Sequence, residues 1–379
     1  RWSGELLEAA QSLDRVLTIS RASGDSSSAV ETLCSLAAVQ LAQGQLHKTV
    51  ATCREALLLG DEHARRSGQR LPVVASSYNI MSQVLFEWND LDGALLQASQ
   101  GITLSEQWGW PEGLALGYRR RARALQAAGD PDGARQAIQK ARQSASGLSP
   151  WFGAHMAAHE AHLWLAQGYP AKAFQWAQDS GLSADDEPGY QRMDEYNTLA
   201  RVLIAQCKLD QASKLLAHLL ELAETAGAMV SLVETLALQA LVFQTRGQDK
   251  QALDTLERAL TIARPQGFVR IFVDEGPPMG QLLRRAIAQG IVVDYAGNLL
   301  AELEEEAVTD TTPLISPLSA RESEVLRLLT TPLSHAEIAE ELVVSLHTVR
   351  SHVKSIYTKL DVHSRMQAVD RARELGLLD

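Results

Sequence analysis

Residues 343–360, VVSLHTVRSHVKSIYTKL, combine basic and hydroxyl side chains in a stretch without a carboxylate. Arg and Lys donate hydrogen bonds to phosphates and base edges, so these residue types suit contact with a nucleic acid. A solvated amphipathic helix would have the same composition, so the flanking elements must decide between the two. The candidate DNA contacts are His347, Thr348, Arg350, Ser351, Lys354, Thr358 and Lys359.

The apolar residues of this stretch predict one buried helix face. They recur at i, i+4, i+7 and i+11, which forms a narrow stripe on a helix. Serines precede this helix and three neighbouring helical stretches as N-caps, and Glu322 completes a capping box with the first of them. Four short helices with a tight turn between the second and third predict a helix-turn-helix unit from residue 318. The stripe is Val349, Val353, Ile356 and Leu360, and the caps are Ser319, Ser334, Ser345 and Ser364.

The stretch HMAAHEAH places His155, His159 and His162 on one side of a helix. Imidazoles at this spacing could hold a metal ion, but the stretch is not HExxH and no carboxylate is fixed beside it in the sequence. A structural or ligand-facing role is therefore favoured, and we expect neither a metal nor another cofactor.

The composition indicates a cytosolic protein rather than a membrane or secreted one. The net charge is −11 and the three cysteines lie far apart, which is typical of a reducing compartment. No long apolar run predicts a membrane span. No Ser/His/Asp or Cys/His set indicates an enzyme, and no GxxxxGK[ST] motif is present, so we expect neither binding nor hydrolysis of ATP.

The apolar periodicity of residues 5–263 predicts helices in a pattern that repeats every 39 to 45 residues. It does not predict strands. Each period has a turn residue, a small residue five positions later and another seven positions earlier. Small residues at fixed places let paired helices cross closely, as in a helical solenoid. The turn residues are Gly44, Asn89, Gly129, Gly168, Cys207 and Gly247.

These repeats resemble tetratricopeptide repeats, with Tyr78, Tyr118 and Tyr196 at the place of that family's first large aromatic residue. The period is longer than usual in that family, and other helical solenoids have repeats of similar length. The resemblance implies that the first helix of each pair lines a concave groove. The groove positions, which could bind an effector or a peptide or be polar only because water fills the groove, are Asn79, Gln83, Arg119, Arg123, His155, His162, Asp194, Asn197, Arg201 and Glu234.

The chain divides at ELEEEAVTDTTPLISP, which is acidic and then rich in Thr and Pro. Its lack of periodicity predicts a linker over residues 302–317. We therefore expect a repeat domain over residues 1–301 and a second domain over residues 318–379.

The second domain resembles the LuxR-type helix-turn-helix family through LSARESEVLRLL, IAEEL, TVRSH and KLDVHSR. The resemblance implies that the third helix enters the major groove, with Arg350, Ser351 and Lys354 facing base edges and Thr348 and Lys359 on the backbone. It also implies dimerisation through the last helix, residues 364–378.

The two domains together resemble MalT-type regulators, signal-transduction ATPases with a helical-repeat sensor before a LuxR-type tail. GFVRIFVDEGPPM resembles the close of that repeat region, but the ATPase motif is missing. Because the first residue is Arg1, we expect the ATPase to lie upstream rather than to be absent from the protein.

The sequence thus predicts an all-α, DNA-binding transcription regulator whose repeat domain senses an effector or partner. We expect it to bind double-stranded DNA as a homodimer, to contact RNA polymerase and to have no membrane partner. The alternative is a helical-repeat scaffold that recruits proteins without sequence-specific DNA binding.

Overall fold

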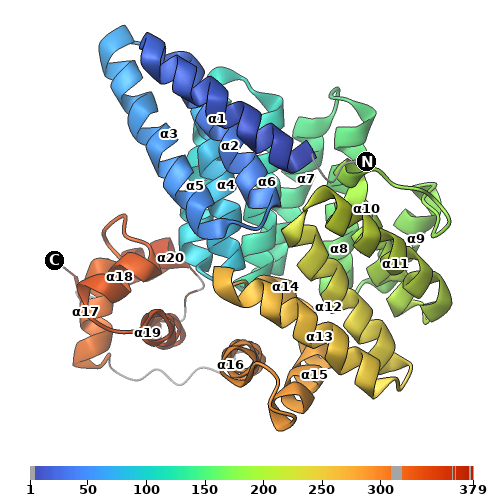
Figure 1. The fold of residues 1–379 in the computed structure, drawn as a ribbon. Helices are drawn as coiled ribbons and strands as arrows, with labels where there is room; N and C mark the ends of the chain where they lie inside the picture. The colour runs from blue at the N-terminus through green and yellow to red at the C-terminus, as the bar shows by residue number, and fades with distance from the viewer. Residues whose placement is uncertain (1–4, 309–317, 361, 363, 375–376, 379) are drawn as a thin grey trace.

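All regular elements in the described part of the chain are helices (Figure 1). The computed structural model describes residues 5–308, 318–360, 362, 364–374 and 377–378. An all-α fold with a helical solenoid before a helix-turn-helix domain is therefore confirmed. None of the helices in these residues combines the length and the apolar character needed to cross a bilayer.

The solenoid begins with α1 (Glu5–Ser23) and continues as successive antiparallel helix pairs. A short 3-10 helix, η1 (Tyr190–Arg192), precedes the fifth pair, and another, η2 (Arg264–Gln266), follows the sixth. The pairs are α2 (Ser26–Ala42) with α3 (Leu46–Ser67), α4 (Val74–Glu87) with α5 (Leu91–Trp108), α6 (Pro111–Ala127) with α7 (Pro131–Ala145), α8 (Pro150–Ala166) with α9 (Pro170–Asp179), α10 (Met193–Ala205) with α11 (Leu209–Ala226), and α12 (Met229–Thr245) with α13 (Asp249–Ala263).

The turn inside each pair is the residue that the repeat predicted. All six turn residues have a positive φ, including Asn89 and Cys207 at 58°. Small residues fill the predicted crossing points and are fully buried, so that the helices of a pair approach closely. These residues are Ala37, Thr49, Ser82, Ala94, Ala122, Ala134, Ala161, Ala173, Ala200, Ala212, Ala240 and Ala252, each 0% exposed.

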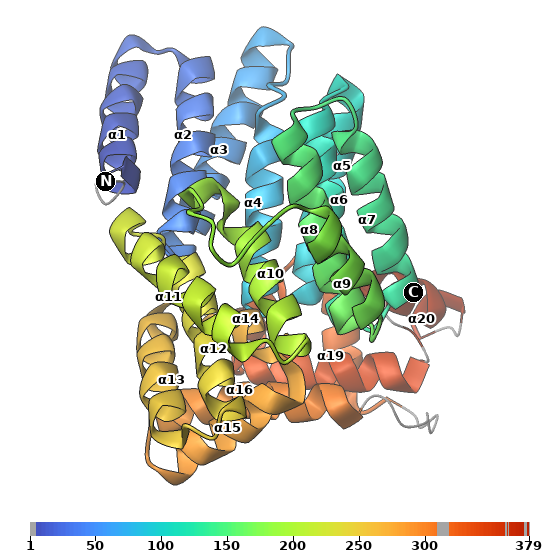
Figure 2. The same cartoon turned by 90° about the vertical axis from the view of Figure 1, so that its right-hand side faces the viewer.

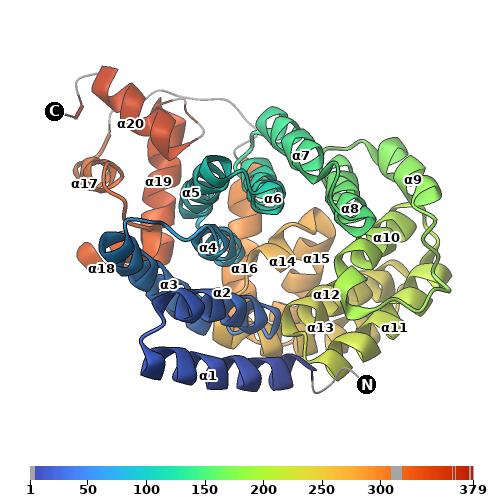
Figure 3. The ribbon, with the colours of Figure 1, turned by 90° about the horizontal axis from the view of Figure 1, so that it is seen from above.

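The solenoid curls until its first and last pairs meet (Figure 3). Helix α12 packs against α2, and one hydrophobic core joins residues of α2 and α3 to residues of α10–α13. A second contact closes the ring where the Trp88 indole donates to the Gln266 carbonyl (2.8 Å) and the Val269 amide donates to the Glu87 carbonyl (2.7 Å). The first helices of the pairs therefore face an enclosed interior.

Three helices follow the last pair and cover one end of the ring: α14 (Arg270–Val273), α15 (Gly276–Ala288) and α16 (Val293–Val308). The structure differs from the sequence analysis at the boundary, because residues 302–308 belong to α16 and not to a linker. Glu, Leu and Ala favour a helix, and Leu303 packs on the ring core. The remaining predicted linker residues, 309–317, lie outside the described residues.

The C-terminal domain has its own hydrophobic core and lies beside α5 and α16 (Figures 1 and 2). Its helices are α17 (Ala320–Leu328), α18 (His335–Glu341), α19 (Leu346–Leu360) and α20 (Arg365–Glu374). Helix α19 is central and contacts the other three.

Candidate nucleic-acid interface and interior polar cluster

Helix α19 turns its predicted apolar stripe inward. Val349, Val353, Ile356 and Leu360 are all buried in the core of the C-terminal domain. The predicted caps are also present, since capping boxes form at Ser319 and Ser334, and the other two serines accept from an amide three residues on. The side chains opposite the stripe are thereby held on one outward face of a fixed helix.

The predicted DNA contacts differ in their surroundings on that face. His347, Ser351 and Thr358 are exposed, and Thr348, Arg350, Lys354 and Lys359 are partly buried. Lys359 pairs with Glu322 inside the domain, with Nζ 2.7 Å from Oε2. A phosphate at this position would therefore have to compete with the Glu322 carboxylate for the ammonium group.

Two of the candidate base contacts touch α16 of the solenoid instead of solvent. Arg350 Nη1 donates to Glu302 Oε1 (3.0 Å), and both side chains are nearly buried. The Lys354 ammonium donates to the Glu305 carbonyl oxygen, and the His347 Nε2 atom lies 4.0 Å from Glu305 Oε1. Figure 1 looks down α16 and α19 end-on, and Figure 2 shows them running alongside each other.

Two carboxylates at the start of α5 hold the rest of the domain. Asp90 caps α5 through the Gly93 amide, accepts from the His335 amide (3.2 Å), and lies 3.3 Å from His335 Nδ1. Asp92 lies 3.2 Å from His335 Nε2, and accepts from the Tyr357 hydroxyl and from the Arg365 amide (3.2 Å). Asp92 thus contacts one residue from each of α18, α19 and α20.

The sequence carried no signal that would single out Asp90 and Asp92. Asp130 and Asp132 hold the same places in the next repeat, one and three residues after the turn residue. Asp130 caps α7 in the same way through the Gly133 amide, but the Asp132 side chain is 76% exposed. Contact with the C-terminal domain therefore distinguishes Asp92 from Asp132.

The interior of the ring holds most of the predicted groove residues. They share a polar cluster, called here the interior cluster, with residues that the repeat register did not identify. The register missed Glu87, Arg120, His159 and Thr198, and it could not reach Arg270 and Asp274, which lie beyond the last repeat. The predicted residues in the cluster are Gln83, Arg119, Arg123, His162, Asp194, Arg201 and Glu234.

The other three predicted groove residues do not line the cavity of the cluster. Asn79 is buried between helices, where its amide donates to the Gly113 carbonyl (3.1 Å). Asn197 is buried and accepts from the Thr235 hydroxyl (3.2 Å). His155 stacks on Trp151 with ring centroids 5.4 Å apart. The two asparagines join neighbouring helices because the close crossings leave no open groove beside them.

Ion pairs fill the interior cluster and leave a cavity of about 40 Å³. Arg201 donates to Glu234 (2.8 Å) and to Glu275 (3.0 Å from Nε). Arg123 Nη2 lies 3.5 Å from Asp274 Oδ2, and its guanidinium stacks on Phe86. A cavity of this size holds a few waters at most, since one water needs about 10–15 Å³. A ligand would have to displace protein side chains.

Burial shifts the pKa values of several side chains in this interior. It raises the pKa of Glu87 to about 7, although Arg123 acts in the opposite direction. It lowers the pKa of Arg119 to about 10, and burial together with the Arg119 charge lowers the pKa of His155 to about 4. His155 is therefore neutral at pH 7, whereas Glu87 can exchange a proton close to that pH.

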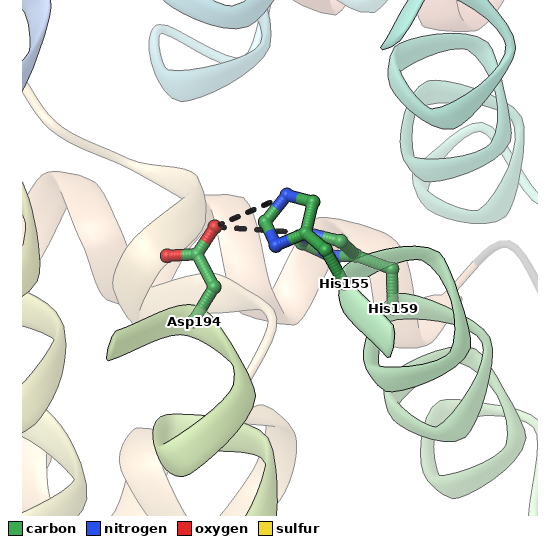
Figure 4. Close-up of side chains that lie close together, drawn as sticks. All are labelled: His155, His159 and Asp194. Atoms are coloured by element: carbon green, nitrogen blue, oxygen red, sulfur yellow. Dashed lines mark ion pairs between the residues drawn. The ribbon is translucent and has the colours of Figure 1, made fainter. Parts of the chain in front are cut away.

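His155, His159 and Asp194 converge from α8 and α10 in a geometry that could hold a metal ion (Figure 4). Asp194 Oδ2 lies 3.6 Å from His159 Nε2 and 4.0 Å from His155 Nε2, so the fold supplies the carboxylate that the local sequence lacked. Arg119 opposes a cation here: it hydrogen-bonds His159 Nε2 and lies 3.6 Å from Asp194. A guanidinium can only donate, so this imidazole nitrogen is already occupied as an acceptor.

Comparison with family models matches nearly the whole chain. Residues 2–289 match the model of the MalT-like TPR region, and residues 316–372 match bacterial regulatory proteins of the luxR family. The second match contains all of α17, α18 and α19.

Among curated proteins, the chain is similar to the HTH-type transcriptional regulator MalT of Yersinia pestis strain Pestoides F and of Serratia proteamaculans strain 568. The identities are 28% over 373 residues and 27% over 368 residues, covering 89% of this chain and 40% of each relative. The chain therefore spans less than half the length of these relatives. Among solved structures, the APC/C hetero-tetramer Cut9–Hcn1 aligns with 80% of this chain and 53% of that chain, at 14% identity and a TM-score of 0.48, which is too low to support an argument.

Proposed function

The chain belongs to the family with a MalT-like TPR region and carries a luxR-family domain at its C-terminal end, and we propose that it is a DNA-binding transcription regulator. The observation that supports this proposal most directly is the division of α19 into a buried side and an outward side. One side of this helix is fixed in the domain core, and the other presents Arg350, Ser351 and Lys354 on its outward face. A helix that reads the major groove needs this division.

The proposed sensor is the solenoid, which ends with α16, and the proposed DNA-binding domain begins at residue 318. The interior cluster supports a sensing role because it gathers charged groups of both signs in a buried space. A small polar effector or a peptide that enters this space would exchange internal ion pairs for contacts with itself. Such an effector can shift the solenoid only by the difference in its affinity for two conformations.

The remaining partners follow from a role on DNA. Two copies of the domain that pair through α20 would meet half-sites about one helical turn apart. A regulator acts where the DNA is transcribed, which favours the cytoplasm and a contact with RNA polymerase. Neither a catalytic reaction nor a cofactor is proposed for this chain.

The test compares Arg350→Ala with Lys359→Ala in the whole chain. Operator sequences are first selected from random duplexes, and affinity is then measured for selected and random DNA at the same salt concentration. Loss of a base contact costs about 1–3 kcal/mol, so Arg350→Ala should lower the ratio of selected to random affinity by roughly tenfold or more. Effects of the substitution on the unbound protein cancel in this ratio.

Lys359→Ala should weaken binding to both kinds of DNA by the same factor, and should reduce the salt slope by about one. Equal effects of the two substitutions on the ratio would contradict the assignment of Arg350 to base contact. A wild-type chain that selects no sequence from the random pool would favour the alternative, a scaffold that recruits proteins.

A further inference from the structure

The face of α19 proposed to read DNA is covered by the solenoid. Arg350 and Lys354 both bond to residues of α16, at Glu302 and at the Glu305 carbonyl. The Arg350 side chain is only 13% exposed and that of Glu302 is 12% exposed. A duplex cannot reach these donors while α16 is in place, because the same atoms would have to face base edges.

The second contact lies at the start of α5, next to α16, because the Asn89 amide before α5 donates to Glu302 (2.8 Å). There the Asp92 carboxylate is hydrogen-bonded to the His335 ring, the Tyr357 hydroxyl and the Arg365 amide. The Asp90 carboxylate accepts a hydrogen bond from the His335 amide. Both carboxylates are at least 94% buried. Ionised acceptors form stronger hydrogen bonds than neutral ones, and burial shields them from salt. The C-terminal domain is thus held by two neighbouring helices of the solenoid, α5 and α16.

The contacts of Arg350 also indicate that the docked placement of the C-terminal domain is not maximally stable. Its Nε and Nη2 atoms are buried and have no hydrogen-bond partner among the residues that the structure describes. Unmade hydrogen bonds of buried donors cost free energy, and that cost disappears when the side chain is released to water or to DNA. The covered state therefore combines strong contacts with a built-in penalty, which suits an arrangement that must be reversible.

We infer that the solenoid keeps the helix-turn-helix domain off DNA by binding it through Asp90, Asp92 and Glu302, called here the docking carboxylates. This inference rests on the proposed function and adds its regulation. Of the docking carboxylates, Glu302 offers an anionic acceptor to Arg350 on the basic α19 face, as a phosphate of DNA would. Activation then requires release of both contacts before α19 can enter a groove.

The test uses the whole chain with Asp92→Asn and Glu302→Gln, separately and combined. Asp92→Asn leaves the α5 cap intact, because Asp90 provides that cap. Asp132→Asn is the matched control, since Asp132 has the same place in the next repeat and is exposed. Circular dichroism checks the fold, and Glu302→Gln alone provides a second route should Asp92→Asn unfold.

Two quantities are measured on each variant. The first is affinity for a fluorescent duplex of mixed sequence at constant salt. The second is hydrogen exchange at the amides of His335 and Arg365, which donate to the docking carboxylates. The combined variant should bind the duplex about tenfold or more tightly than the wild-type chain does. The reason is that the apparent DNA affinity is proportional to the fraction of molecules in which α19 is uncovered. Its two amides should exchange faster by a similar factor, and Asp132→Asn should change neither quantity.

The outcomes separate this inference from the proposed function. Faster exchange with unchanged DNA affinity would overturn the inference, because docking would then not block DNA. Unchanged exchange and unchanged affinity would overturn it too, since the covered state would not be populated. If no variant binds DNA although exchange becomes faster, the proposed function itself fails and the inference fails with it.

Discussion

His335 is the titratable residue at the centre of the contact between the two domains. It is buried, and the groups facing it are Asp90, Asp92 and Tyr357, with the charges of Arg350 and Arg365 nearby. Burial by itself would lower the pKa of His335, but the two aspartates outweigh burial and raise the pKa above its ordinary value. A protonated imidazole is therefore the form that fits between the carboxylates.

Docking should consequently weaken as pH rises. The docked pKa of His335 lies above the undocked value of about 6.5, so the stabilisation is complete below that value and is lost as pH rises through the docked pKa. Exchange of the Arg365 amide, corrected for its intrinsic pH dependence, should become faster across this range. His335→Gln should remove most of the dependence. A slope that persists in His335→Gln would assign the titration to another group.

At the scale of elements, one side chain joins three parts of the helix-turn-helix domain. Arg365, at the start of α20, donates to the carbonyls of Leu329 (2.8 Å) and Leu333 (2.6 Å). It also donates to the carbonyls of Leu328 and Thr331. The last carbonyls of a helix have no partner inside that helix. Arg365 satisfies them at the end of α17 and orders the loop that leads to α18.

We therefore predict that Arg365→Ala lowers the free energy of unfolding of this domain by about 2–3 kcal/mol, since hydrogen bonds to charged groups contribute about 1.5–3 kcal/mol each and are not additive. Arg365→Lys should recover only part, because an ammonium group lacks the planar fork of donors. The measurement is hydrogen exchange of the α17 amides in the whole chain. Arg327→Ala, an exposed arginine on α17, is the control. Equal losses in the two alanine variants would refute the role given to Arg365.

At the scale of the whole molecule, a chain of polar contacts connects the interior cluster to α19. Glu302 accepts from Arg350 and from the Asn89 amide (2.8 Å), and Asn89 in turn accepts from Arg270 (3.2 Å). Arg270 Nε donates to Asp274 (2.8 Å), which pairs with Arg123 in the cluster. The ring closure makes this chain possible, because it places α14 beside the turn before α5.

Asn89→Gly should break the chain of polar contacts between the interior cluster and α19. Glycine adopts the positive φ of Asn89 without strain, so the turn is kept while the amide is lost. Arg123→Ala should accelerate exchange of the His335 amide in the wild-type background and have a smaller effect beside Asn89→Gly, with a coupling energy of about 1 kcal/mol. Cys207→Gly, at another turn inside a helix pair and with the same φ of 58°, is the control. Additive effects of Arg123→Ala and Asn89→Gly would show that the contacts carry no coupling.

Local order was readable from the sequence because it depends on neighbours in the chain. The six turn residues, the small crossing residues, the serine caps and the stripe from Val349 to Leu360 all follow from helix geometry and spacing. Five of the seven candidate DNA contacts, His347, Arg350, Ser351, Lys354 and Thr358, were placed roughly opposite that stripe, and their contact with DNA remains a prediction. The boundary at residue 302 was missed because an acidic helix and an acidic linker have similar compositions.

Only the tertiary structure decided what the polar residues contact. Each repeat is rotated slightly relative to the one before it, and these rotations add up until the ring closes. The sequence of a single repeat does not show this closure. Closure turned an expected open groove into a buried cluster and brought Arg270 and Asp274 into it from outside the repeats. It also made Asp92 a docking residue and left Asp132 exposed, although the two have the same place in the repeat. The sequence alone therefore determined the local helix geometry, whereas the accumulated curvature and domain position determined burial, ion pairing and access to α19.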